Sequence, residues 1–327
     1  MSRSRPIGFI TGIAGFAGSH LAELLLSKGF RVYGGLHPRE RLDNIAHLKS
    51  DLELLRFDIQ NTERCERAID RIRPDYIWHL AAMASVWRSF ETEQQVYRVN
   101  FEGTLNLLQA AKRDRRLKTF VFVSSADCYG IFKPKSLTLT EEQPLNPISP
   151  YALSKALAEQ ACRFYHTRYD LPVVIARSFA HCGPRQSADF VVAAFARQVA
   201  LIEADRQQPV IRVGNLSPRR DMSDVRDIVD GYRRLALKGR PGRVYQLCSG
   251  KAVKIESILK QLLNLSQRSI KVRIDRERFR PVDVPVQRGN NERAVQEVGF
   301  VSRYTLKTTL KDTLDYWRDQ VRGKHTG

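Results

Sequence analysis

Residues 7–18 read IGFITGIAGFAG, and this stretch decides how the N-terminal half of the chain folds. An apolar run that suits a buried strand leads directly into three glycines, Gly12, Gly15 and Gly18. In this spacing the first glycine permits a tight turn, the second lets a pyrophosphate approach the backbone, and the third lets a helix pack against the strand. The alternative is a glycine-rich turn without a ligand. The position of the three glycines at the start of a strand–turn–helix unit favours dinucleotide binding.

Outward from this turn, strand-like and helix-like segments alternate through the first half of the chain. Short apolar runs predict strands over 7–11, 31–35, 52–58, 76–81, 119–124 and 171–177. Apolar residues at helical spacing predict helices over 19–28, 62–72, 94–112 and 151–169. This alternation predicts the α/β class, with a Rossmann-type doubly wound parallel sheet that helices cover on both faces.

Beyond residue 177 the pattern loosens into loops rich in glycine, proline and arginine. Shorter helices are predicted over 224–237, 255–265 and 308–318. We therefore predict a nucleotide-binding domain over 1–177. A smaller α/β region that binds the substrate is predicted over 178–327, interleaved with the first.

The composition excludes several classes of protein. The 327 residues carry a formal net charge of +19, and 43% of them are apolar, which is enough to bury a core and excludes a disordered chain. No apolar run approaches the roughly 18 residues of a membrane span, and we expect no signal peptide. The five cysteines lack CxxC spacing, so we expect no disulfides, no metal site and a cytoplasmic protein. The basic charge predicts an anionic partner, either nucleic acid or an anionic cofactor and substrate.

The end of the second predicted strand indicates which cofactor is bound. NAD-binding proteins usually carry an acid there, about 20 residues after the glycine turn. The segment VYGGLHPR over 32–39 has no acid, and Arg41 follows Arg39 closely. Because an arginine can bind a 2′-phosphate through two hydrogen bonds, this segment favours NADP(H). Alternatively, both arginines are solvated loop charges. Asp58, after the third strand, is a candidate adenine contact or the cap of a surface helix.

The motif YALSK over 151–155 places Tyr151 and Lys155 on one face of a predicted helix. A nearby cation stabilises a phenolate, so Lys155 is expected to lower the pKa of Tyr151 toward the working pH. Such a tyrosine can exchange a proton with a carbonyl or carbinol oxygen. Ser125 ends the strand before it, where parallel sheets bind ligands, so its hydroxyl can bind the same oxygen. An ordinary surface pair on a helix is the alternative.

Several segments together resemble a known family. The segments TGIAGFAG over 11–18, HLAA over 79–82, VNFEGT over 99–104, VSSADCYG over 123–130 and YALSK stand in the order of the extended short-chain dehydrogenase/reductases. The segments 177–186, 213–232, 244–250 and 280–294 are similar to the GDP-mannose 4,6-dehydratase branch of that family. They are most similar to its GDP-6-deoxy-4-keto-D-mannose reductases, which yield GDP-D-rhamnose. The resemblance covers essentially the whole chain.

The resemblance implies roles for individual residues. Tyr151 would be the general acid, Lys155 would adjust its pKa and bind a ribose, and Ser125 would orient the carbonyl group. Asp127 is the fourth expected catalytic residue. With the residues argued above, the expected NADP(H) contacts are Gly12, Gly15, Phe16, Ala17, Gly18, Arg39, Asp58, Ile59, Leu80, Ala81, Ala82, Asn100, Tyr151, Lys155 and Arg185. The expected substrate contacts are Ser125, Ala180, Asn215, Arg220, Arg280 and Asp283.

Within these sets, the resemblance separates three tasks. Arg220 and Arg280 would bind a diphosphate, a task to which arginine forks are suited. Asp283 would contact the nucleotide ribose, and Asn100 would hold the active-site helix. From the residues alone, Arg220 could instead form a salt bridge with Asp221 or Asp224.

Two departures from the family pattern bear on the reaction. Ala180 stands where the family carries an asparagine that touches the substrate. Dehydratases carry threonine at the position of Ser125 and, at that of Asp127, a glutamate that moves protons during water elimination. Asp127 is one methylene shorter, and a misplaced proton carrier lowers a rate by orders of magnitude. We therefore expect NADPH-dependent reduction of the 4-keto group of a GDP-linked 4-keto-6-deoxy sugar.

Other interpretations stay open. The chain could be a GDP-mannose 4,6-dehydratase or a UDP-sugar 4-epimerase. It could also be an NADP-sensing protein that binds nucleic acid through basic clusters at 112–116 and 271–280, although the intact Tyr151–Lys155 pair argues against this. In the family, the helices here over 94–112 and 151–169 pair across a two-fold axis, so a homodimer is expected. We expect no nucleic-acid or membrane partner.

Overall fold

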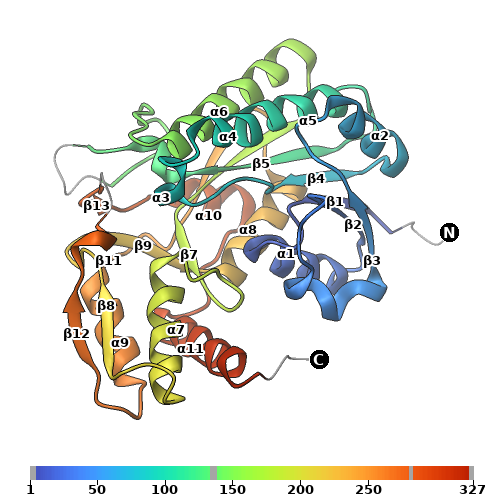
Figure 1. Ribbon diagram of the computed structural model, residues 1–327. Coiled ribbons are helices and arrows are strands. Elements are labelled where there is room, and N and C mark those ends of the chain that lie inside the picture. The colour runs from blue at the N-terminus through green and yellow to red at the C-terminus, as the bar shows by residue number, and fades with distance from the viewer. Residues whose placement is uncertain (1–4, 133–137, 280–282, 324–327) are drawn as a thin grey trace.

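The centre of the protein is a seven-stranded parallel sheet (Figure 1). The computed structural model describes residues 5–132, 138–279 and 283–323. In spatial order the strands are β10 (Val244–Leu247), β6 (Val173–Ser178), β5 (Thr119–Ser125), β4 (Tyr76–His79), β1 (Ile7–Thr11), β2 (Arg31–Leu36) and β3 (Leu52–Arg56). Every neighbouring pair is parallel, so all seven strands end at one edge.

Helices cover both faces of this sheet (Figure 1). On one face lie α1 (Phe16–Ser27), α8 (Val225–Lys238) and α10 (Glu292–Val298). On the other lie α2 (Thr62–Ile72), α5 (Gly103–Ala111) and α6 (Pro150–Tyr169). Successive side chains of a strand point to opposite faces, so Trp78 packs into the first layer and Ile77 into the second. The predicted doubly wound α/β fold is confirmed.

The C-terminal region forms a second, smaller layer at the lower left of Figure 1. One small sheet contains β7 (Ala180–Cys182), β9 (Arg219–Asp224), β11 (Ala252–Lys254) and β13 (Val286–Gln287). A parallel pair consists of β8 (Val210–Val213) and β12 (Lys271–Ile274). They enclose a separate core with α7 (Val191–Glu203), α9 (Ile255–Asn264) and α11 (Leu306–Arg322). Since β10 and α8 belong to the large sheet and its cover, the chain crosses between the two regions after residue 178.

The helix predicted over 94–112 is present over 93–111, but one turn within it is π-helical. It consists of α4 (Glu93–Tyr97), a π-helical turn η2 (Arg98–Glu102) and α5. The wide turn carries Asn100, whose carbonyl accepts a hydrogen bond from Thr104 Oγ1 at 2.6 Å. Such turns insert one extra residue and often occur at functional sites. The remaining short helices are η1 (Asp43–Asp51), α3 (Val86–Ser89), η3 (Ala126–Tyr129) and η4 (Arg276–Arg278).

Two general features complete the fold. No helix within the described ranges is long and apolar enough to cross a bilayer. All five cysteines are buried as free thiols.

Candidate active site

The glycine turn connects β1 to α1 and lies at the sheet edge where the strands end. Gly12 has φ of +70°, and a Cβ there would lie 2.9 Å from the backbone of Ala81. A Cβ on Gly18 would lie 2.2 Å from the Gly12 carbonyl oxygen. Gly15 is the N-cap of α1, and no side chain caps this helix end. The turn is therefore a cradle that side chains would fill, in front of a helix N-terminus that attracts phosphate.

The loop after β2 carries Arg39, which is exposed. Arg56, at the end of β3, braces this loop by donating hydrogen bonds to the carbonyl oxygens of Pro38 at 2.9 Å and Glu40 at 3.1 Å. Arg41 forms an ion pair with Asp43 at 2.8 Å. The two arginines of this loop therefore differ in their surroundings. Sequence reasoning did not single out Arg56, because its guanidinium acts on backbone that lies 16 to 19 residues earlier.

Asp58 follows β3 and lies beside the same loop. Its carboxylate accepts a hydrogen bond from the backbone N–H of Gln60 at 2.9 Å and lies 3.9 Å from His37 Nε2. The helix-capping alternative for Asp58 is wrong, because Asn61 caps α2 by accepting from the N–H of Arg64. The carboxylate of Asp58 therefore does not cap a helix.

Arg185 reaches α1 from the loop after β7. Its guanidinium donates to Glu23 Oε2 at 2.6 Å and to the carbonyl oxygen of Asn44 at 3.2 Å. Asn44 in turn donates to the carbonyl oxygen of Ala14 in the glycine turn at 3.0 Å. Arg185 has φ of +71°, a left-handed conformation that is rare without glycine. These contacts place Arg185 behind the cradle, where it supports the turn.

Leu80, Ala81 and Ala82 follow β4 and pass the glycine turn. Leu80 N–H donates to the carbonyl oxygen of Thr11 at 3.3 Å, and Ala81 N–H donates to Thr11 Oγ1 at 3.2 Å. Ile59 packs against Gly103, the first residue of α5, where a Cβ would lie 2.7 Å from the Ile59 side chain. The backbone of residues 80–82 is therefore held against the cradle.

Asn100 ties the loop after β4 to α6. Its side-chain oxygen accepts from the N–H of Met83 at 2.8 Å, and its amide donates to Ser154 Oγ at 3.0 Å. Ser154 in turn donates to the carbonyl oxygen of Tyr151 at 2.7 Å. This agrees with a structural task for Asn100 and leaves its side chain little capacity for a direct cofactor contact.

Tyr151, Lys155 and Ser125 meet at the carboxyl end of β5. Ser149 caps α6, Pro150 occupies its first turn, and Tyr151 and Lys155 follow on one buried face. Lys155 Nζ donates to the carbonyl oxygen of Val123 at 2.8 Å, which fixes α6 to β5. Ser125 Oγ accepts from the N–H of Asp127 at 3.1 Å.

The pKa of Tyr151 is raised, whereas the sequence predicted that Lys155 would lower it. Burial, followed by the nearby Asp127 carboxylate, raises the pKa of Tyr151, and a hydrogen bond with Ser125 opposes this only in part. Burial lowers the pKa of Lys155 to about 8, and its ammonium is directed at a carbonyl oxygen. Burial therefore outweighs the expected effect of the lysine. A phenol that stays protonated is the form that can donate a proton to a carbonyl oxygen.

Asp127 is held from the second layer of the fold. Gln287, which is almost fully buried on β13, donates from Nε2 to Asp127 Oδ1 at 3.3 Å. The two residues are 160 positions apart, so no local motif predicts this contact. It fixes the carboxylate that raises the pKa of Tyr151.

Three of the predicted substrate contacts come together from the loop before β9, from β9 itself and from the segment before β13. Arg220 forms an ion pair with Asp283 and donates to the carbonyl oxygen of Val284 at 2.6 Å. Asn215 donates to Asp283 Oδ2 at 3.3 Å. Arg280 lies outside the described residues.

The alternative salt bridges of Arg220 with Asp221 or Asp224 are wrong. The carboxylate of Asp221 accepts from Ser249 and from the backbone of Gly250, while that of Asp224 binds Arg226. Adjacent residues on β9 alternate between faces, which directs Asp221 away from its neighbour.

Ala180 is half-buried on β7, in register with Met222 of β9. Beside it, His181 stacks on Phe16 of α1, with ring centroids 5.7 Å apart. This contact joins the glycine turn to the substrate region. The sequence did not predict this contact, because no spacing pattern links two rings that are 165 residues apart.

A buried charged network lies beside the carboxyl end of β5. Arg177 and Glu159 are fully buried and form an ion pair, with Arg177 Nε donating to Glu159 Oε2 at 2.9 Å. Glu159 also accepts from Ser124 Oγ at 3.1 Å, next to Ser125. Glu159 lies on α6 two turns after Tyr151, so the network joins α6 to β5.

In the parts of the chain that the structure describes, no group of three or more His, Cys, Asp or Glu residues is arranged to hold a metal ion. The glycine cradle and the Ser125–Tyr151–Lys155 group define a short-chain dehydrogenase/reductase, an NAD(P)-dependent oxidoreductase with a Rossmann fold. The chain belongs to the GDP-mannose 4,6 dehydratase family, whose sequence model matches residues 9–313.

Three relatives place it within that family. It is 32% identical over 314 residues to the GDP-6-deoxy-D-mannose reductase of Pseudomonas aeruginosa, covering 96% of this chain and 98% of the other. The solved structure of RMD from Pseudomonas aeruginosa complexed with NADPH has a TM-score of 0.82 at 31% identity, covering 96% and 99% of the two chains. The human GDP-mannose 4,6 dehydratase is 26% identical, covering 95% and 91%.

Proposed function

We propose that the protein uses NADPH to reduce the 4-keto group of a GDP-linked 4-keto-6-deoxy-hexose, giving GDP-D-rhamnose. The observation that carries this proposal is the position of Tyr151, which is buried beside Ser125 and one helical turn before Lys155 at the carboxyl end of the sheet. Burial and Asp127 raise the pKa of Tyr151, so its phenol is protonated and able to donate. Similarity over nearly the full length to a GDP-6-deoxy-D-mannose reductase supports the same reaction.

The residues fit nicotinamide adenine dinucleotide phosphate. Side chains in place of Gly12 and Gly18 would collide with backbone, so this turn stays open in front of the α1 N-terminus, and Arg39 lies on a braced loop where a 2′-phosphate would be paired. When bound, NADPH supplies a hydride to the carbonyl carbon. The solved relative with NADPH supports this choice over NADH.

The protein's own part in the reaction is to hold the ketone and deliver a proton. Tyr151 donates its phenolic proton to the carbonyl oxygen as negative charge develops there. Ser125 donates a hydrogen bond to the same oxygen and lowers the energy of that charge. Lys155, anchored to the Val123 carbonyl oxygen, keeps α6 and Tyr151 in register with β5.

The second candidate is the dehydratase reaction, favoured by the family's name and by the human relative. That reaction needs a carboxylate that moves a proton on the sugar. Asp127 is shorter than the glutamate of dehydratases, and Gln287 holds it in place. These two features support reduction.

One experiment separates the candidates and also tests the cofactor. Purified protein is given GDP-mannose alone, or GDP-4-keto-6-deoxymannose with NADPH or with NADH, and the products are analysed by NMR. We expect consumption of the ketone with NADPH, slower turnover with NADH, and no reaction of GDP-mannose. Consumption of GDP-mannose without added cofactor would establish the dehydratase instead, and equal rates with NADH would contradict the NADP(H) preference.

The same proposal includes a homodimer formed by α4, α5 and α6. Leu153, Leu157 and Phe164 lie on one face of α6 and leave 38%, 38% and 56% of their surfaces exposed. Leu157→Arg is expected to convert a dimer to a monomer in sedimentation velocity, because it places a charge in an apolar interface. Leu237→Arg, at an equally exposed leucine on α8, is the control. A monomeric wild-type protein, or a dimeric Leu157→Arg variant, would contradict this arrangement.

The free, buried thiols are consistent with a reducing compartment, and we place the enzyme in the cytoplasm.

A further inference from the structure

A cavity of about 250 Å³ lies between the two regions of the fold. Met83, Ser85 and Arg88 line it from the loop after β4 and from α3, whereas Asp189 and Phe190 line it from the segment before α7. Figure 1 shows α3 below α4 and α6, on the side toward the second layer. The cavity therefore marks the boundary between the nucleotide-binding region and the substrate region.

An ion pair crosses this boundary. Arg88 Nη2 donates to Asp189 Oδ1 at 2.8 Å, although the two residues are 101 positions apart. Among the residues that the structure describes, it is the one ion pair that joins 86–169 to 180–224. The two side chains leave 62% and 39% of their surfaces exposed. An exposed ion pair is weak and is screened by salt, so this contact can break and re-form during turnover.

The backbone that carries Arg88 is firmly held. The side chain of Asn100 accepts from the N–H of Met83 at 2.8 Å and donates to the carbonyl oxygen of the same residue at 3.1 Å. Ser85 caps α3 by accepting from the N–H of Arg88 at 3.3 Å, and Thr92 Oγ1 donates to the Arg88 carbonyl oxygen at 3.0 Å. Because Asn100 is also bonded to α6, this wall of the cavity is fixed to the helix of the proton donor.

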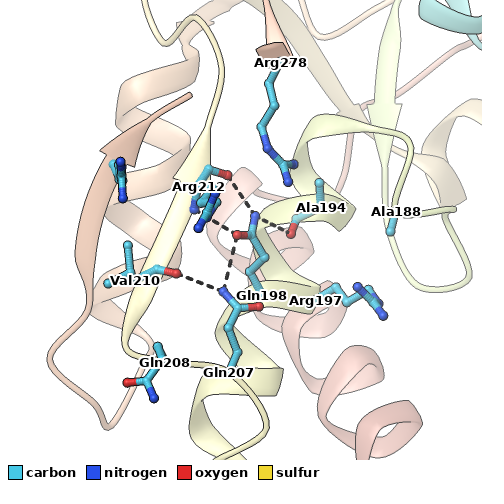
Figure 2. Close-up of a pocket in the computed structure, with 10 residues that line it drawn as sticks. Ala188, Ala194, Arg197, Gln198, Gln207, Gln208, Val210, Arg212 and Arg278 are labelled. Atoms are coloured by element: carbon cyan, nitrogen blue, oxygen red, sulfur yellow. Dashed lines mark hydrogen bonds between the residues drawn. The ribbon is translucent and has the colours of Figure 1, made fainter. Parts of the chain in front are cut away.

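The segment 187–190, which carries Asp189, has open space on both sides. Ala188 lines a second cavity of about 480 Å³, together with residues of α7 and β8 (Figure 2). Ser187 and Asp189 are exposed, and Phe190, the N-cap of α7, makes no side-chain hydrogen bond to that helix. Segments with few packed neighbours open more easily than core elements. Segment 187–190 is therefore the movable wall, opposite the fixed wall of Arg88.

We propose that the Arg88–Asp189 ion pair is a latch that holds segment 187–190 closed over the bound substrate. The inference rests on the proposed function, in which the substrate contacts both the proton donor and the substrate region. The hydrogen bond between Asp127 and Gln287 crosses the same boundary beside the proton donor, so the latch closes a site that is already bridged at a second point. A closed latch keeps water from the ketone during reduction, and its opening releases the alcohol product.

The test compares removal of the two charges with their exchange. Arg88→Met and Asp189→Asn each break the pair, whereas Arg88→Asp combined with Asp189→Arg restores it with the charges swapped. Stopped-flow fluorescence measures how fast GDP-4-keto-6-deoxymannose dissociates from the complex with NADP⁺, in which no hydride is available. We expect dissociation about three- to fivefold faster in each single variant and within about twofold of wild type in the swapped variant. At about 0.5 M NaCl the difference between wild type and the single variants should vanish, because salt screens the pair.

Amide hydrogen exchange without substrate tests the latch separately from the proposed function. Both single variants should exchange faster than wild type over 187–190, and the swapped variant should not. Arg31→Met and Glu53→Gln are the matched controls, because they break an ion pair of similar exposure, 55% and 45%, between β2 and β3. These controls should leave both the exchange over 187–190 and the dissociation of the ketone unchanged.

Three results overturn the latch: unchanged exchange over 187–190 in both single variants, unchanged dissociation of the ketone, or an effect of Arg88→Met that Asp189→Asn does not share. The last result would mean that Arg88 acts on the substrate itself. If exchange follows the expected pattern but the wild type does not reduce the ketone with NADPH, the pair still closes segment 187–190 and the proposed function fails alone.

Discussion

Tyr151→Phe is expected to lower the rate of NADPH-dependent ketone reduction by about a hundredfold to ten-thousandfold, with NADPH affinity unchanged. The hydroxyl is the proton donor in the proposed reaction, and burial with Asp127 keeps it protonated. The ring itself packs at the start of α6, so phenylalanine fills the same space. Stopped-flow oxidation of NADPH measures the rate, and fluorescence titration measures cofactor binding.

The control for this variant is Tyr169→Phe, at the exposed end of the same helix. It removes a phenol of the same kind outside the site and should keep the wild-type rate. If Tyr151→Phe kept near wild-type turnover, Tyr151 would not be the proton donor. A parallel loss of NADPH binding would show that the hydroxyl serves the cofactor site instead.

The second large effect concerns stability. Arg177→Met is expected to lower the free energy of unfolding by about 3 kcal/mol, because it leaves the buried Glu159 carboxylate with only the more exposed Arg163, 3.3 Å away, as an ion-pair partner. Glu159→Leu should cost a similar amount by stranding the guanidinium. Urea unfolding followed by circular dichroism measures both variants.

The double variant Glu159→Leu with Arg177→Met should recover much of this loss, since two apolar side chains replace two charges. The exposed pair Arg67 and Glu63 on α2 supplies the control, and its removal should cost less than about 1 kcal/mol. Single buried variants that lose no more than this control would show that water reaches the pair.

The sequence predicted those parts of the site that local patterns encode. Gly12 and Gly18 are required where the backbone packs too closely for a Cβ, and this requirement fixes the spacing of the glycines in the sequence. Tyr151 and Lys155 share a helical face because they are four residues apart. The parallel sheet followed from strands and helices that alternate in order.

Contacts between distant segments could not be predicted in the same way. Asp221 and Asp224 were the nearest acids to Arg220 in sequence, but β13 brings Asp283 to it from 63 residues away. Gln287 reaches Asp127 through the same strand. The pKa of Tyr151 depends on burial, which a pair of nearby residues in a motif does not report.

The return of β10 to the large sheet has a consequence for synthesis of the chain. β6 ends at Ser178, but its outer neighbour β10 begins at Val244. While the intervening residues are being translated, β6 is an open edge that can pair with other chains. A nascent chain that stalls in this interval has an unpaired margin at β6, and until α8 and α10 have been made one face of its sheet is also incompletely covered. Chaperone demand should therefore be high there and fall once β10 has emerged.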